Sequence, residues 1–142
     1  MTETYRGLLE RTSMEPIISV RNLKKIFTIG DNKVPALNGL DFDIYQGEFI
    51  AIVGTSGSGK STCLNMLAGL EKPSEGKIHI VGEEIEKMNE SELVTFRRNH
   101  VGFIFQSYNL IPFLDAVENV AMPLMFRGVG KEERNKAALH YL

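Results

Sequence analysis

Gly54-Thr55-Ser56-Gly57-Ser58-Gly59-Lys60-Ser61 matches the phosphate-binding pattern G-x-x-x-x-G-K-[ST] at every fixed position. The segment follows the continuous apolar run of residues 49–53, which is typical of a strand buried on both faces. It opens a predicted helix over residues 60–68, with Gly69 as the stop signal. A flexible Gly/Ser linker would not stand between such a strand and such a helix. The segment therefore predicts a phosphate-binding loop in an α/β nucleotide-binding protein.

Each residue type in this segment suits the binding of phosphate. Backbone N–H groups in a concave loop hold the anion, and glycines at 54, 57 and 59 let the backbone approach and adopt positive φ. Lys60 would bring a full positive charge to the β- and γ-phosphates, and the Ser61 hydroxyl would coordinate Mg²⁺. The predicted nucleotide-binding set is Gly54, Thr55, Ser56, Gly57, Ser58, Gly59, Lys60, Ser61 and Thr62.

The residues before this loop predict a small antiparallel sheet. A strand is expected from residue 17 towards Phe27, and a turn over residues 30–33. Residues 40–44 alternate apolar and acidic side chains, as a half-buried strand does. Residues 77–81 read as another short strand.

The residues after this sheet predict helices around one more buried strand. Asn89 and Glu92 form a capping-box pattern for a helix that extends to about residue 99. Residues 101–105 predict the buried strand, which ends at Gln106. A short helix capped by Asp115 and limited by Pro123 is expected to reach about residue 120, and residues 131–142 predict a last helix. The longest apolar run is far too short to span a membrane.

Composition and charge exclude several classes of protein. Hydrophobic residues make up 43% and charged residues 24%, which is ordinary globular usage. The formal net charge of −2 argues against nucleic acid as a partner. The single cysteine, Cys63, cannot form an internal disulfide, and residues 1–15 contain no apolar signal-peptide segment. A cytoplasmic protein is expected, so that any membrane role would come through a partner.

From about residue 17 onward the chain resembles the ATP-binding subunits of ABC transporters, especially the lipoprotein-release and macrolide-export (LolD and MacB) branch. The resemblance rests on the phosphate loop, on residues 69–76 (GLEKPSEG) and on residues 96–106 (FRRNHVGFIFQ). It continues through residues 109–112 (NLIP) and 118–120 (ENV). It implies a P-loop NTPase core with an N-terminal antiparallel β-subdomain and the start of a helical subdomain.

The resemblance assigns further roles and partners. Phe27 stands where the family places an aromatic that stacks on adenine; a core Phe closing the small sheet is the alternative. Gln106 stands at the family's Q-loop, where its carboxamide would join the Mg²⁺ shell or position water. ATP and Mg²⁺ are the implied cofactors, and Lys60 and Gln106 the implied catalytic residues. A transmembrane permease and a second copy of the subunit are the implied partners, which places the protein on the inner face of the membrane.

The resemblance also implies elements that this sequence does not contain. The family's L-S-G-G-Q signature, its apolar strand ending in Asp-Glu (Walker B) and its switch His have no counterpart here. We therefore expect a lead-in over residues 1–15 and a partial nucleotide-binding domain over 16–142. Residues 16–86 would form the β-subdomain and phosphate-loop core, and 87–142 the incomplete Q-loop and helical part.

Negligible ATP hydrolysis is expected of this chain alone, because positioning and charge stabilisation supply nearly all of phosphoryl-transfer catalysis. The alternatives are a nucleotide-binding fragment without turnover and, less favoured, another P-loop kinase or GTPase. The GTPase alternative is weakened because the guanine-reading N-K-x-D pattern has no match in the sequence.

Overall fold

A computed structural model describes residues 15–142 of the chain. These residues divide into two compact units, one ending at Thr95 and the other comprising residues 96–142. Each unit is described by itself below. Residues 1–14, which make up nearly all of the expected lead-in, lie outside the described residues.

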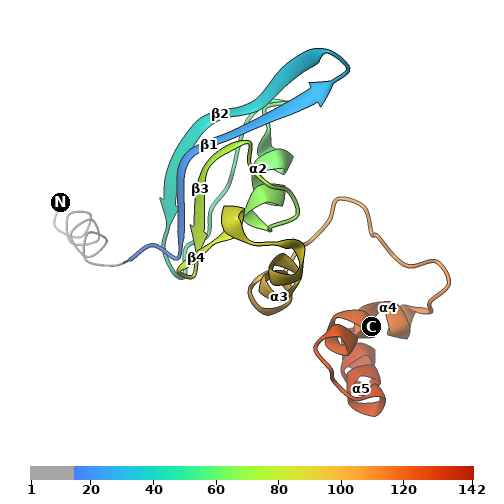
Figure 1. The fold of residues 1–142 in the computed structure, drawn as a ribbon. Helices are drawn as coiled ribbons and strands as arrows, with labels where there is room; N and C mark the ends of the chain where they lie inside the picture. Colours follow the sequence, from blue (N-terminus) through green and yellow to red (C-terminus); the bar gives the residue numbers. More distant parts are fainter. Residues whose placement is uncertain (1–14) are drawn as a thin grey trace, which may run out of the picture. The chain divides into compact units, whose positions relative to one another are not determined.

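The first unit is built on a four-stranded antiparallel sheet in the order β2-β1-β3-β4. Strands β1 (Ile18–Ile29) and β2 (Asn32–Ile44) form a long hairpin, which Figure 1 shows in blue (β1) and cyan (β2). Strand β3 (Glu75–Ile80) pairs with β1, and the two-residue β4 (Glu83–Glu84) pairs with β3. The predicted antiparallel sheet is therefore confirmed. Its first two strands run longer than expected.

One helix covers part of this sheet and ends in a defined cap. Helix α2 (Lys60–Leu67) confirms the helix predicted after the phosphate loop, and it packs against β2. Gly69 has φ +64°, and its N–H donates to the Met66 carbonyl at 3.0 Å. The N–H of Leu70 donates to the Asn65 carbonyl at 2.8 Å. These two bonds form a Schellman motif, so Gly69 stops the helix as the sequence predicted.

The core of the first unit lies between the sheet, α2 and the segment that follows β4. That segment is the 3₁₀ turn η1 (Ile85–Lys87), which packs against β3. The buried apolar side chains are Val20, Leu23, Leu37, Cys63, Met66, Ala68, Ile78, Ile80, Ile85 and Leu93.

Helix α3 (Glu90–His100) crosses the division between the units and begins where the sequence predicted. The Asn89 N–H donates to Glu92 Oε2 at 2.7 Å, and the Glu92 N–H donates to Asn89 Oδ1 at 3.1 Å. This reciprocal pair is the expected capping box. Acidic side chains occupy the first turn and basic ones the last, an order that complements the helix dipole.

The second unit contains two helices that pack on each other, α4 (Ala116–Phe126) and α5 (Lys131–Tyr141). Asp115 caps α4 with Glu118, through backbone-to-carboxylate bonds of 2.7 and 3.0 Å. The prediction that α4 ends near residue 120 is wrong, because Pro123 lies inside the helix. Proline removes one backbone donor from a helix, and packing on α5 offsets that loss here. Among the described residues, no helix is both long and apolar enough to cross a membrane.

The two buried strands predicted over residues 49–53 and 101–105 are not strands in this structure. Phe49 is 98% exposed and Val53 86%, and in the second unit Ile104 is 98% exposed. A strand buried on both faces needs hydrogen-bonded neighbours and covering layers. The described strands form one sheet, and neither segment joins it. The apolar patterns are real, but the described residues supply no pairing partner for them.

Glycine at position 76 is required because the backbone of β1 approaches β3 closely at this point. Gly76 has φ +96°, and a β-carbon there would overlap the Asn22 carbonyl oxygen and lie 2.7 Å from that of Arg21. We expect Gly76→Ala to lower the free energy of unfolding by about 3 kcal/mol, through backbone strain and overlap together. Urea unfolding followed by circular dichroism measures this change.

Gly82→Ala provides the matched control. Gly82 has a similar φ of +80°, but a β-carbon there meets nothing within 4 Å. Only the conformational cost of about 1 kcal/mol should remain. Equal losses in the two variants would contradict the close packing of β1 on Gly76.

Candidate functional site

The phosphate loop lies in the first unit and leads directly into α2. Gly59 is the N-cap residue of α2 with φ +85°, and no side chain caps the helix end. The first turn of α2 carries no acidic side chain. The free N–H groups and partial positive charge of this helix end are therefore available to an anion.

Two glycines of the loop are required for different physical reasons. A β-carbon on Gly59 would overlap the carbonyl oxygen of Ala36 and lie 2.7 Å from Leu37 Cδ2. Gly59 therefore lets the loop rest directly on β2. Gly57 has φ +79° with open space around it, so that only its backbone conformation calls for glycine.

Glycine at residue 54, at the start of the loop, leaves room for the Ser58 side chain. A β-carbon on Gly54 would lie 2.7 Å from Ser58 Oγ. The Ser58 N–H donates to the Thr55 carbonyl at 3.3 Å, which closes the turn. A side chain at residue 54 would therefore crowd the interior of this loop, the cradle in which backbone N–H groups would have to reach a phosphate.

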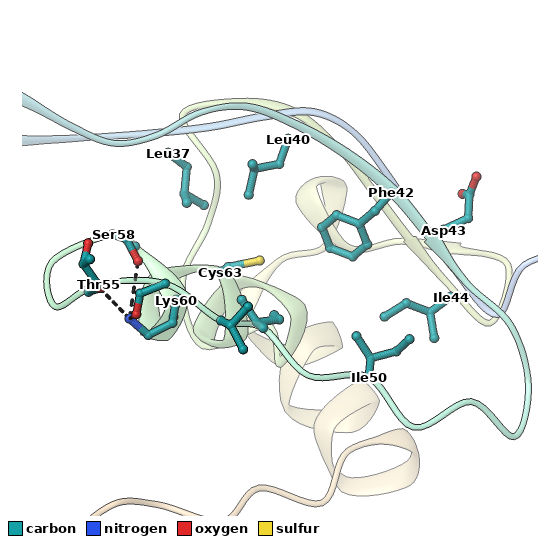
Figure 2. A pocket seen from close by; sticks show the side chains of 14 residues that line it. Leu37, Leu40, Phe42, Asp43, Ile44, Ile50, Thr55, Ser58, Lys60 and Cys63 are labelled. Carbon is teal, nitrogen blue, oxygen red and sulfur yellow. Dashed lines mark hydrogen bonds between the residues drawn. The ribbon is translucent and has the colours of Figure 1, made fainter.

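Lys60 is held by oxygen atoms of its own loop. Its ammonium group donates to the carbonyls of Gly54 at 2.9 Å and Thr55 at 2.6 Å, and to Ser58 Oγ at 3.3 Å (Figure 2). These contacts use all three donors of the ammonium group. The Ser58 contact is the longest of the three, and it is therefore the easiest to exchange for a phosphate oxygen. The two carbonyls would keep the charge in the cradle during that exchange.

Ser61 and Thr62 follow in the first turn of α2, where Ser61 is exposed and Thr62 half-buried. A serine hydroxyl beside a phosphate cradle is a hard oxygen ligand of the kind that Mg²⁺ prefers. Together with the cradle, this donor set fits a Mg²⁺–nucleotide. Among residues 15–142, no cluster of three or more His, Cys, Asp or Glu side chains is placed to hold a metal ion by itself.

An apolar cavity of about 620 Å³ opens beside the loop, between β2 and residues 50–53 (Figure 2). Its lining includes Leu37, Leu40, Phe42, Asp43, Ile44, Ile50, Ile52, Val53, Gly54, Thr55, Ser58, Gly59, Lys60 and Cys63. The guanidinium of Arg21 hydrogen bonds Asp43 at 2.7 Å and holds the pKa of that carboxyl below its usual range. The charge of Asp43 is thereby balanced within the sheet.

Cys63 is buried in the first turn of α2, where only 2% of it is exposed. A helix N-terminus alone would lower the pKa of a thiol. Burial is the dominant effect here, and it raises the pKa of Cys63. Of the two roles that the sequence allows, a reactive thiol and a small packing residue, the structure favours the packing residue.

Phe27 lies on β1 in register with Val34, half-buried, and is not part of the cavity lining. The ammonium of Lys25 lies over its ring, 5.2 Å from the centroid. Gln106 lies in the second unit, exposed, directly after the irregular segment 101–105. The structure thus gathers residues 54–62 at one place, whereas Phe27 lies elsewhere on the same unit and Gln106 on the other unit.

The support of the loop by Ala36 and Leu37 was not predicted. We expected a turn over residues 30–33 and a strand only from residue 40, whereas β2 begins at Asn32. In the sequence, Pro35 argues against a strand at this position, because proline cannot donate a hydrogen bond to a neighbouring strand. It is tolerated here because β2 is an edge strand of the sheet. The signal that could have found it is the pair Val34 and Ala36, two apolar residues with strand spacing.

Comparison with known proteins gives a consistent result. Residues 37–142 match the ABC transporter family. An uncharacterized ABC transporter ATP-binding protein of Thermotoga maritima is 43% identical over 91% of this chain and 55% of its own length. The lipoprotein-releasing system ATP-binding protein LolD of Chromohalobacter salexigens is 41% identical over 90% of this chain and 54% of its own. The macrolide export ATP-binding/permease protein MacB of Hahella chejuensis is 45% identical over 87% of this chain and 19% of its own.

A solved structure shares the fold. It is the ATP-binding cassette MJ0796, a Methanocaldococcus jannaschii protein, as a dimer in a post-hydrolysis state bound to ADP and Pi. It superimposes with a TM-score of 0.82 at 41% identity, over 87% of this chain and 54% of that one. The expected ABC cassette fold is therefore confirmed. The chain spans about half the length of the Thermotoga maritima protein and of LolD.

The raised pKa of Cys63 predicts a slow thiol. At pH 8 the folded chain should react with an aromatic disulfide reagent at least about tenfold more slowly than the chain in 8 M urea, because burial disfavours the thiolate and blocks access. The rate should increase with pH beyond the ordinary thiol range. Absorbance of the released thiol measures it.

A chain carrying both Cys63→Ala and Leu64→Cys is the control, since Leu64 is 47% exposed on the same helix. This control should react quickly in the folded state. A native Cys63 that reacts as fast as the control would contradict the buried thiol.

Proposed function

This chain belongs to the ABC transporter family, and on that premise we propose that it binds Mg²⁺–ATP as the nucleotide-binding part of a transporter that exports or releases its substrate through a membrane partner. The observation that carries this proposal is the phosphate loop: a cradle resting on β2, a free helix end, and a lysine anchored inside. Phosphate groups are the ligand that such an arrangement fits best.

The loop residues would divide the work of holding the nucleotide. Backbone N–H groups of residues 54–60 would bind phosphate oxygens, and Lys60 would exchange its Ser58 contact for the β- and γ-phosphates. Ser61 would ligate Mg²⁺, and Thr62 would reach the α-phosphate. When bound, Mg²⁺ would neutralise charge on the phosphates.

Phe27 and Gln106 would complete the site from outside the loop. The Phe27 ring offers a flat apolar face on which adenine could stack. Gln106 would contribute its carboxamide to the Mg²⁺ shell or position the attacking water. Both roles come from family resemblance. They need only a flat ring and a neutral amide with a donor and an acceptor.

A transmembrane permease and a second copy of the subunit are the proposed partners. MacB is named as an ATP-binding/permease protein, and the solved MJ0796 cassette is a dimer. In this proposal the permease would hold the protein on the cytoplasmic face of the membrane. The apolar residues of the second unit, such as Phe113 and those at 124–126, are candidates for that contact, with packing inside the helical part as the alternative.

Turnover is expected to be weak in residues 1–142 alone. In the family, the strand ending in Asp-Glu supplies an Asp that completes the Mg²⁺ shell and a Glu that polarises the attacking water. The signature encloses the γ-phosphate from the opposite subunit. Residues 1–142 contain neither motif. The alternative of a nucleotide-binding chain without turnover follows if no further polypeptide supplies these groups.

Replacing the lysine tests the binding site. Lys60→Ala should weaken binding of a fluorescent ATP analogue by at least about 100-fold, because a full charge on the phosphates is lost. Ser58→Ala removes only the longest of the three Lys60 contacts and should change affinity by less than about threefold. Fluorescence anisotropy with Mg²⁺ present measures both. Unchanged affinity in Lys60→Ala would overturn the proposal.

Phosphate release tests the catalytic expectation. The purified chain should release phosphate from ATP no faster than its own Lys60→Ala variant, although it binds the nucleotide. The Gln106→Ala variant should release phosphate at the same rate as these two proteins. A rate clearly above that of Lys60→Ala would show that these residues suffice for hydrolysis.

A further inference from the structure

Lys25 holds an unusually constrained position on β1. Its ammonium forms an ion pair with Glu71 Oε1 at 3.0 Å and donates to the Lys72 carbonyl at 2.7 Å. Only 15% of the Lys25 side chain and 27% of that of Glu71 are exposed. The same ammonium lies over the Phe27 ring, 5.2 Å from its centroid. A lysine held by two oxygens has little freedom, and it restricts the ring beneath it.

The strand register places Lys25 on the face of the sheet that supports the phosphate loop, and the Phe27 ring lies beside the Lys25 ammonium. Lys25 pairs with Leu37, whose side chain lies against Gly59. Cross-strand partners point to the same face, so Lys25 and Leu37 share one. The register shifts between Lys25 and Ile26, and Phe27 then pairs with Val34, three residues along β2 from Leu37 or roughly 10 Å of strand. The position of the Phe27 ring therefore follows from its contact with the Lys25 ammonium. A nucleotide with its phosphates in the loop could extend its base along this face.

We propose that Lys25 is a positioning residue for the purine base: it fixes the Phe27 ring and occupies one face of it, so that the base stacks on the opposite face. This inference rests on the proposed function and deepens it. Glu71 and Lys72 supply two oxygens for the three donors of the ammonium, and the ring is the third group beside it. The cation is attracted to the π-face of the ring, and this attraction orients the ring as well as covering it.

We call Lys25, with its partners Glu71 and Lys72, the clamp. It also connects the part of the site proposed for the base to the part proposed for the phosphates. Glu71 and Lys72 follow the cap of α2 formed by Gly69 and Leu70, whereas the phosphate loop precedes the same helix. Lys25 therefore fixes Phe27 relative to the helix that carries Lys60 at its other end. A base and a triphosphate can bind together only if these two ends keep a constant spacing.

The test compares ATP with inorganic triphosphate, which has no base. Lys25→Met keeps most of the side-chain length and removes the charge. We expect it to lower the ratio of ATP affinity to triphosphate affinity about three- to fivefold, with triphosphate affinity itself within twofold. Titration calorimetry on the full chain with Mg²⁺ gives both constants. Phe27→Ala should lower the same ratio by at least as much.

Lys24→Met is the matched control. Lys24 forms an ion pair with Glu75 at 2.7 Å but has no contact with the Phe27 ring among those observed. It should leave the ratio unchanged, and Lys25→Arg should restore most of it. Glu71→Gln, which loosens the clamp without touching Lys25, should have an effect in the same direction as Lys25→Met. Thermal unfolding confirms that each variant is folded.

Several outcomes overturn the inference while leaving the phosphate site intact. They are a ratio in Lys25→Met equal to that in Lys24→Met, a ratio that rises because the ammonium was blocking the base, and a ratio unaffected by Phe27→Ala. If the wild-type chain binds neither ATP nor triphosphate, the proposed function fails and this inference falls with it.

Discussion

The close approach of Gly59 to β2 is the contact on which the site depends. The phosphate loop has no strand partner on its N-terminal side, since residues 49–53 join no described sheet. It is held instead by α2 and by the backbone of Ala36, against which a β-carbon at residue 59 would overlap. Glycine at residue 59 lets the phosphate loop and the N-terminal end of α2 lie directly against β2 of the hairpin. Lys60 is anchored within this loop, and Lys25 lies on β1 opposite Leu37, the residue whose side chain lies against Gly59.

The site is built with its charge already in place. Lys60 is bonded to carbonyl oxygens of its own loop, so its ammonium does not have to be brought in from solvent when an anion binds. Lys25 is restrained in a similar way by Glu71 and the Lys72 carbonyl. Restraining a charged side chain before binding reduces the entropy lost on binding. The two lysines therefore prepare the loop and the aromatic ring for opposite ends of one ligand.

The errors in the sequence predictions have a common physical origin. Residues 49–53 have the pattern of a fully buried strand, yet Phe49 is almost fully exposed, because burial depends on partners that the described residues do not include. Pro123 predicted an early end for α4, yet packing on α5 carries the helix to Phe126. Pro35 hid the start of β2 for a related reason, since an edge strand tolerates proline. Local patterns report preferences, and neighbouring elements decide the outcome.

The sequence by itself determined the loop that opens α2, the capping box of α3, the Asp115 cap of α4 and the glycine stop of α2, because each depends on residues within a few positions of one another. The resemblance of its motifs to those of ABC transporter ATP-binding subunits also indicated the family, which the comparisons confirm. Only the tertiary structure showed that Ala36 and Leu37 support Gly59, that burial outweighs the helix end at Cys63, and that Lys25 covers Phe27. These contacts join residues far apart in the chain, and their register depends on the whole sheet.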